Sequence, residues 1–104
     1  MTPNYQLIPA RTMYSLTRWV TVAQPPGDFL YAVLSNNLKE SYNRGDDENL
    51  RALYHITCWL YNHAPGGCWG SPDKVNKWEG MDWIDVTGLR AFENKWMNQC
   101  MEEV

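Results

Sequence analysis

The sequence predicts an all-α protein, a compact single domain of about five helices with a central amphipathic helix. Apolar residues recur at spacings of three and four along several segments, which is the period of a helix with one buried face. Proline, glycine or a capping side chain bounds each of these segments. One short alternating segment has no second strand pattern to pair with, so we expect no sheet. The length of 104 residues is that of one domain, and six Trp and six Tyr provide large side chains for its core.

The first part of the chain predicts an arm followed by a helix. Residues 1–8 show no helical period, so we expect an N-terminal arm that lies on the body through Tyr5, Leu7 and Ile8. A helix is expected from Pro9, because proline suits a first helical turn, and its apolar stripe is Met13, Leu16 and Val20. Two prolines and a glycine at positions 25–27 end it.

The second helix is expected to begin at Asp28, whose carboxylate can accept hydrogen bonds from the free N–H groups of the first turn. Its predicted buried stripe consists of Phe29, Leu30, Val33, Leu34 and Leu38. Asn36 and Asn37 are expected either to kink this helix or to end it. Residues 39–43 are read either as a continuation or as a short separate turn, and Gly45 closes the unit.

The central helix is expected to start at the acidic run 46–48, where an aspartate caps and the other carboxylates face the positive end of the helix dipole. It is expected to run without a break to Ala64 and Pro65. Its predicted inward stripe is Leu50, Leu53, Tyr54, Ile56, Thr57, Leu60 and Tyr61.

Two shorter elements complete the prediction. Ser71 as a cap and Pro72 at the first helical position indicate a short helix to about Trp78. Residues 79–104 are expected to form an acidic C-terminal loop and helix, capped by Thr87, with a frayed end at the glutamates 102–103. The stripe expected for this last helix is Leu89, Phe92, Trp96 and Cys100.

Charge and cysteine usage limit the functional classes. The net charge of −3 argues against broad binding to a phosphate backbone, which needs clustered Lys and Arg. Three cysteines and an N-terminus without a secretory pattern favour a reducing cytoplasm. No apolar run approaches the length of a membrane span, so we expect a soluble protein without membrane contact.

Both histidines and two cysteines lie close together in sequence, and zinc is one possible reading of that cluster. The possible ligands are His55, Cys58, His63 and Cys68. Their spacing matches none of the usual zinc motifs, so we expect no metal and no cofactor and keep a zinc-stabilised structural helper as an alternative. The same residues do not form a recognisable nucleophile motif, so no catalytic residues are assigned and we expect no enzyme.

The helices on either side of residues 64–71 allow a second alternative, a DNA-associated regulator with a helix-turn-helix-like pair. The short reading helix would carry few basic groups on an acidic chain, so nucleic acid is not the favoured partner. Six tryptophans exceed the need of one small core, and aromatic residues left exposed near this turn would anchor a protein partner. The predicted partner-binding residues are Trp69, Ser71, Lys74, Trp78 and Trp83.

The segment from about Ile8 to Trp78 resembles a small uncharacterised protein that recurs in tailed-bacteriophage genomes. The residues that carry the resemblance are PGDFLYAVLSNNL at 26–38, DDEN at 46–49, LYNHAP at 60–65 and CWGSP at 68–72. No activity is assigned to that family, so the resemblance implies a context, the cytoplasm of an infected bacterium. It implies a phage accessory protein that binds a host protein or protein complex stoichiometrically, as an inhibitor of a host enzyme or defence system.

Overall fold

The computed structural model describes residues 2–81 and 85–101, and over them the protein is all-helical. The α-helices of this part are α1 (Ala10–Val22), α2 (Asp28–Leu34), α3 (Leu38–Arg44), α4 (Asp47–Arg51), α5 (Leu53–His63), α6 (Pro72–Lys77) and α7 (Val86–Met101). Two 3-10 turns are η1 (Tyr5–Leu7) and η2 (Gly66–Cys68). The all-α prediction is confirmed over these residues, although they form more helices than the five expected. Five of the seven α-helices have at least seven residues.

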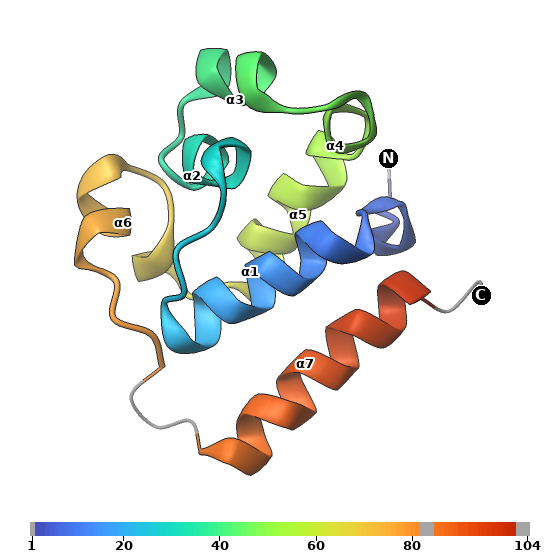
Figure 1. The fold of residues 1–104 in the computed structure, drawn as a ribbon, viewed down its shortest axis with the longest axis vertical. Coiled ribbons are helices and arrows are strands. Elements are labelled where there is room, and N and C mark those ends of the chain that lie inside the picture. The colour runs from blue at the N-terminus through green and yellow to red at the C-terminus, as the bar shows by residue number, and fades with distance from the viewer. Residues whose placement is uncertain (1, 82–84, 102–104) are drawn as a thin grey trace.

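Helix α1 runs through the middle of the molecule (Figure 1). The last helix, α7, packs along α1 in the opposite direction, and α2 packs on α3. The radius of gyration is 13.0 Å, which is the value expected for a folded domain of this length. No helix of the described residues has both the length and the apolar character needed to cross a membrane.

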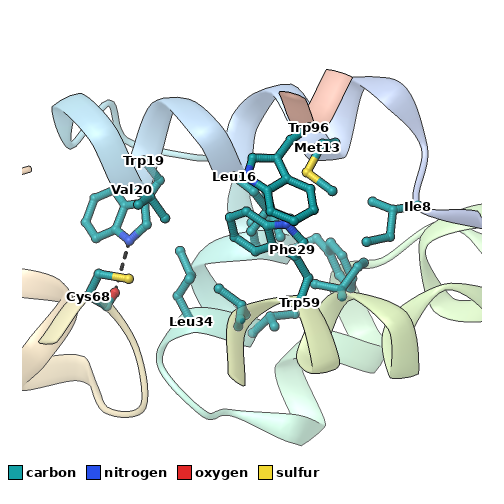
Figure 2. Packing of buried hydrophobic residues seen from close by; sticks show 14 of the residues in the cluster. Ile8, Met13, Leu16, Trp19, Val20, Phe29, Leu34, Trp59, Cys68 and Trp96 are labelled. Carbon is teal, nitrogen blue, oxygen red and sulfur yellow. Dashed lines mark hydrogen bonds between the residues drawn. The ribbon is translucent and has the colours of Figure 1, made fainter. Parts of the chain in front are cut away.

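The core lies between α1, α2 and α5 (Figure 2). Met13, Leu16 and Val20 of α1 are fully buried, as their spacing predicts. Opposite them lie Leu34 of α2 and Trp59 of α5, both also fully buried. Each such side chain contributes roughly 1.5–3 kcal/mol relative to an exposed position, so these three helices provide most of the hydrophobic stabilisation.

The arm lies on the body through two of its three predicted contacts. Ile8 is fully buried and Tyr5 packs edge-on against Trp96. Leu7 is 55% exposed, so its predicted contact is wrong. The 3-10 turn at Tyr5–Leu7 sends consecutive side chains in different directions, and the buried Ile8 follows directly after it.

The second predicted helix divides in two. Helix α2 ends at Leu34, and Asn37 begins α3 by accepting a hydrogen bond from the Glu40 N–H with its side-chain oxygen. Leu38 follows this break and is 66% exposed, so its place in the buried stripe is wrong. The cap of α2 is Gly27, and Asp28 is the first helical residue, which corrects the predicted cap.

The central helix also divides, at Ala52. The Ala52 N–H bonds to the Asn49 carbonyl three residues back, which closes α4 before α5 begins. Helix α4 is tied to α1 instead, because the Thr12 hydroxyl donates to the buried Asn49 side chain at 2.5 Å. Of the two aspartates expected at this cap, Asp46 caps α4 and accepts from the Asn49 N–H at 2.8 Å.

The cap of the last helix differs from the prediction. The Asp85 carboxylate accepts from the Gly88 N–H at 2.7 Å, so Asp85 caps α7 instead of Thr87. Trp96 is buried as predicted, and Leu89 and Phe92 are half-buried. The predicted frayed end at residues 102–103 and the side chain of Cys100 lie outside the described residues.

Candidate functional site

Helix α5 carries two apolar stripes, one on each side. The inner stripe of Ile56, Trp59 and Leu60 is fully buried. The outer stripe, at the spacing i, i+3, i+4, i+7, consists of Tyr54, Thr57, Cys58 and Tyr61. The predicted inner stripe therefore mixed both sides of the helix. Tyr61 is 81% exposed and Tyr54 is 42% exposed, so the outer stripe faces solvent.

The turn after α5 is fixed by hydrogen bonds to two other elements. The Trp19 indole N–H of α1 donates to the Cys68 carbonyl at 3.0 Å inside the core (Figure 2). The Gly70 N–H donates to the Leu34 carbonyl at 2.7 Å. Gly70 has φ +115°, a conformation that side chains rarely adopt. These constraints hold Trp69 in a defined place beside α5.

Three connected hollows surround Trp69. The first, of about 80 Å³, lies between α3 and α5 and includes Leu38 and Thr57. The second, of about 270 Å³, follows the outer stripe from Tyr54 to Tyr61. The third, of about 360 Å³, continues past Tyr61 to Lys74. We call this surface the Trp69 face and define it by Leu38, Tyr54, Thr57, Tyr61, Trp69 and Lys74.

The Trp69 face carries almost no charge. Among the described residues, Lys74 is the one charged side chain that lines its three hollows, and it lies at the end nearest α6. The Lys74 ammonium lies next to Gly70. A Cβ atom added to this glycine would be 3.7 Å from the Lys74 Nζ. Within residues 2–81 and 85–101, Lys74 forms no ion pair with a carboxylate. A partner can therefore reach this cation.

The other predicted partner-binding residues have different roles or positions. Ser71 caps α6 by accepting from the Lys74 N–H at 3.2 Å. Trp78 is half-buried, and its indole N–H donates to the Trp19 carbonyl at 3.0 Å, so this side chain joins α6 to α1. Trp83 lies outside the described residues. Trp69 and Lys74 thus lie together on one face. Ser71 and Trp78 contribute to that face indirectly, since their hydrogen bonds fix the two ends of α6.

The four residues of the zinc alternative do not come together. Cys68 is buried beneath the turn, while Cys58 belongs to the outer stripe of α5. The Nδ1 atom of His55 accepts from the Asn4 backbone N–H at 2.9 Å, and His63 packs against Trp96. Among the described residues, no three His, Cys, Asp or Glu side chains are grouped to hold a metal ion.

His63 belongs to an aromatic cluster that attaches α7 to the body. Its ring centroid lies 4.6 Å from that of Trp96 and 5.5 Å from that of Tyr5. Burial lowers the pKa of His63, and the nearby Lys95 lowers it further.

The buried thiol of Cys68 is not activated. Burial raises the pKa of the Cys68 thiol to about 12, so this cysteine is not a nucleophile near neutral pH. Cys58 is half-buried, and its hydrogen bond with Tyr54 raises the pKa of the tyrosine. Neither arrangement is the cysteine–histidine pair that nucleophilic catalysis uses.

A further hollow of about 340 Å³ lies between α2 and α3, and its lining is charged. Arg44 reaches Asp28 at 3.5 Å and Glu40 at 3.2 Å across it. The charged groups that line this hollow, two carboxylates and one guanidinium, thus already pair with one another within the protein. Two of the three groups on α6 that could contact DNA are also engaged, because the Asn76 side-chain oxygen accepts from the Tyr31 hydroxyl and Lys77 pairs with Asp73, while Lys74 is left.

Sequence reasoning missed Leu38, Tyr54 and Tyr61 as surface residues, because it placed all three in buried stripes. The outer stripe of α5 was nevertheless present as a second complete set of helical spacings. A helix that is apolar on two sides is either buried all round or offers one side to a partner.

Comparison with known proteins finds no matching family model, no matching curated protein and no matching solved structure.

Proposed function

We propose that the protein acts by binding another protein stoichiometrically through the Trp69 face. The observation that carries this proposal is the outer stripe of α5, which leaves Tyr61 81% exposed beside Trp69. Exposed aromatic side chains gathered around connected hollows are typical of the anchors that dominate protein interfaces.

The distribution of large exposed side chains supports this choice of face. Eight large hydrophobic residues of the described chain are exposed, and three of them, Leu38, Tyr54 and Tyr61, belong to the Trp69 face. The turn that presents Trp69 is anchored in the core by Trp19. A preorganised surface of this kind loses little conformational entropy when a partner binds.

The biological context of the proposal rests on the resemblance to the bacteriophage protein. We propose a phage accessory protein of the host cytoplasm whose partner is a host enzyme or a component of a host defence system. Stoichiometric binding fits such a role, since an inhibitor needs a complementary surface and no catalytic group.

Affinity purification from bacterial lysate tests the proposal. The wild-type protein should retain a specific host protein at constant stoichiometry, and Tyr61→Ala should lose most of it. Truncation of an aromatic anchor typically costs about 2 kcal/mol or more, which is about thirtyfold in affinity.

Tyr42→Ala is the matched control for this experiment. Tyr42 is 55% exposed on α3 and lines none of the three hollows. Retention of the same host protein by wild type and Tyr42→Ala, with loss from Tyr61→Ala, supports the proposal. Equal retention by all three proteins contradicts it.

A further inference from the structure

The three hollows of the Trp69 face follow one another along α5. The first lies at Leu53 and Thr57, the second extends from Tyr54 to Asn62 and overlaps the first, and the third begins at Tyr61 and reaches Ala64. The residues of α5 that line them span about three helical turns. From Leu53 to Ala64 the surface is about 16 Å long.

We propose that the Trp69 face binds an amphipathic α-helix of its partner, laid along α5 with one apolar side chain in each hollow and a carboxylate at Lys74. This inference rests on the proposed protein-binding function and specifies the chemistry of the partner. Apolar residues at i, i+4 and i+7 or i+8 of such a helix lie on one side of it and span about 11–12 Å, which fits within the length of this surface.

The chemistry of the surface favours a helix over an extended peptide. The hollows are lined by side chains, with Leu38, Tyr54 and Trp69 among them. An extended peptide gains most of its affinity from main-chain hydrogen bonds to a strand edge, and the described residues contain no strand. Its N–H and C=O groups would lose water on this apolar surface without replacement, whereas a helix satisfies its own.

Charge complementarity determines the polar end of the partner helix. No carboxylate of the part of the chain that the structure describes lines the hollows, and Lys74 at the α6 end is the one charged group there. A Glu or Asp of the partner beside the last hollow would pair with this cation, while a Lys or Arg there would be repelled. The partner helix is therefore apolar along its bound stripe and acidic at one end.

A displayed peptide library tests the inference with a defined probe. Helical peptides of about 18 residues, or five turns, carry three randomised anchor positions spaced by four residues and a terminal position that is Glu, Gln or Lys. Selection against the full-length protein should enrich Leu, Phe, Met or Trp at the anchors and Glu at the end next to Lys74. Selected peptides should bind Tyr61→Ala about tenfold or more weakly, and Tyr42→Ala within about twofold of wild type.

Charge reversal checks the predicted orientation. Lys74→Glu should weaken the Glu-ended peptide and strengthen its Lys-ended counterpart, and a proline at the central turn should abolish binding. No enrichment, or binding that survives both the proline and Tyr61→Ala, overturns the helical partner. If lysate capture still depends on Tyr61 while no helix is enriched, this inference is wrong and the binding function stands. Enrichment of helices without lysate capture supports this inference and contradicts the proposed host target.

Discussion

Three tryptophans differ in what their indole N–H groups contact, and this difference predicts the effect of replacing each ring by phenylalanine. Trp19 and Trp59 are both almost fully buried, at 5% and 0% exposure. The Trp19 N–H donates to the Cys68 carbonyl at 3.0 Å, while the Trp59 N–H has no hydrogen-bond partner among the described residues. Trp78 donates to the Trp19 carbonyl from a half-buried position.

Trp19→Phe is expected to be the most destabilising of the three substitutions. It removes a buried hydrogen bond and leaves a carbonyl without this donor, a loss of about 1–3 kcal/mol beyond the cost of the smaller ring. Trp59→Phe has a similar cost for the smaller ring but removes an unpaired buried donor, which offsets part of that cost. We therefore expect the two free energies of unfolding to differ by about 2 kcal/mol, or roughly 8–16 °C in Tm for a domain of this size.

Urea unfolding and thermal melting followed by far-ultraviolet circular dichroism measure this difference. Trp78→Phe serves as the comparison, because water can replace its half-buried hydrogen bond, and it should cost about 0.5–1.5 kcal/mol. The account of the turn is refuted if Trp59→Phe destabilises the protein as much as Trp19→Phe. Since Trp19 also fixes the turn that presents Trp69, its substitution should weaken partner binding without touching the partner.

Three further predictions concern packing, pH and thiol reactivity. Gly45→Ala should lower the free energy of unfolding, measured in urea, by about 1–3 kcal/mol, because the new Cβ would lie 2.8 Å from the Phe29 ring. Gly66→Ala is the control: its Cβ meets no atom within 4 Å, so the free energy of unfolding should change by less than about 1 kcal/mol. The free energy of unfolding should fall as the pH drops below 6.5, because the pKa of His63 is lower in the folded protein than in the unfolded chain, so that the unfolded chain binds the proton more readily. His63→Gln removes this group and should reduce the loss of stability between pH 7.5 and 5. When the native protein is treated with iodoacetamide at pH 8, peptide mapping should find Cys68 unmodified, because burial raises the pKa of its thiol to about 12. Faster labelling of Cys68 than of the half-buried Cys58 would contradict the burial of Cys68.

The sequence was informative wherever one local interaction decides the structure. Ser71 and Pro72 predict the start of α6, and Asp46 predicts the start of α4, because a cap depends only on the next three residues. The stripe of α1 was also predicted, since its other side is polar and leaves one orientation for the helix.

The sequence was less informative where tertiary contacts decide between similar local choices. No local signal ends a helix at Ala52, and the break accompanies the contact of Thr12 with Asn49, 37 residues apart. The orientation of α5 was ambiguous because both of its sides carry apolar residues at helical spacing. The packing of Trp59 against α7 decides which side is buried and leaves Tyr61 outside.

The candidate site was predicted in part for the same reason. Trp69 and Lys74 were predicted from the turn after α5, and they do line one surface. The tyrosines that extend this surface became visible only once the inner side of α5 was known. Trp78 illustrates the opposite case, since its bond to the backbone of Trp19 depends on a contact between residues 59 positions apart.

Photo-crosslinking from within the surface tests the central claim most directly. A photoreactive phenylalanine analogue replaces either Tyr61, in the Trp69 face, or Tyr42, an exposed tyrosine outside it. After irradiation in the bacterial host, we predict one specific crosslinked host protein from position 61 and none of it from position 42. The same product from both positions, or from position 42 alone, would contradict the claim that the Trp69 face binds the partner.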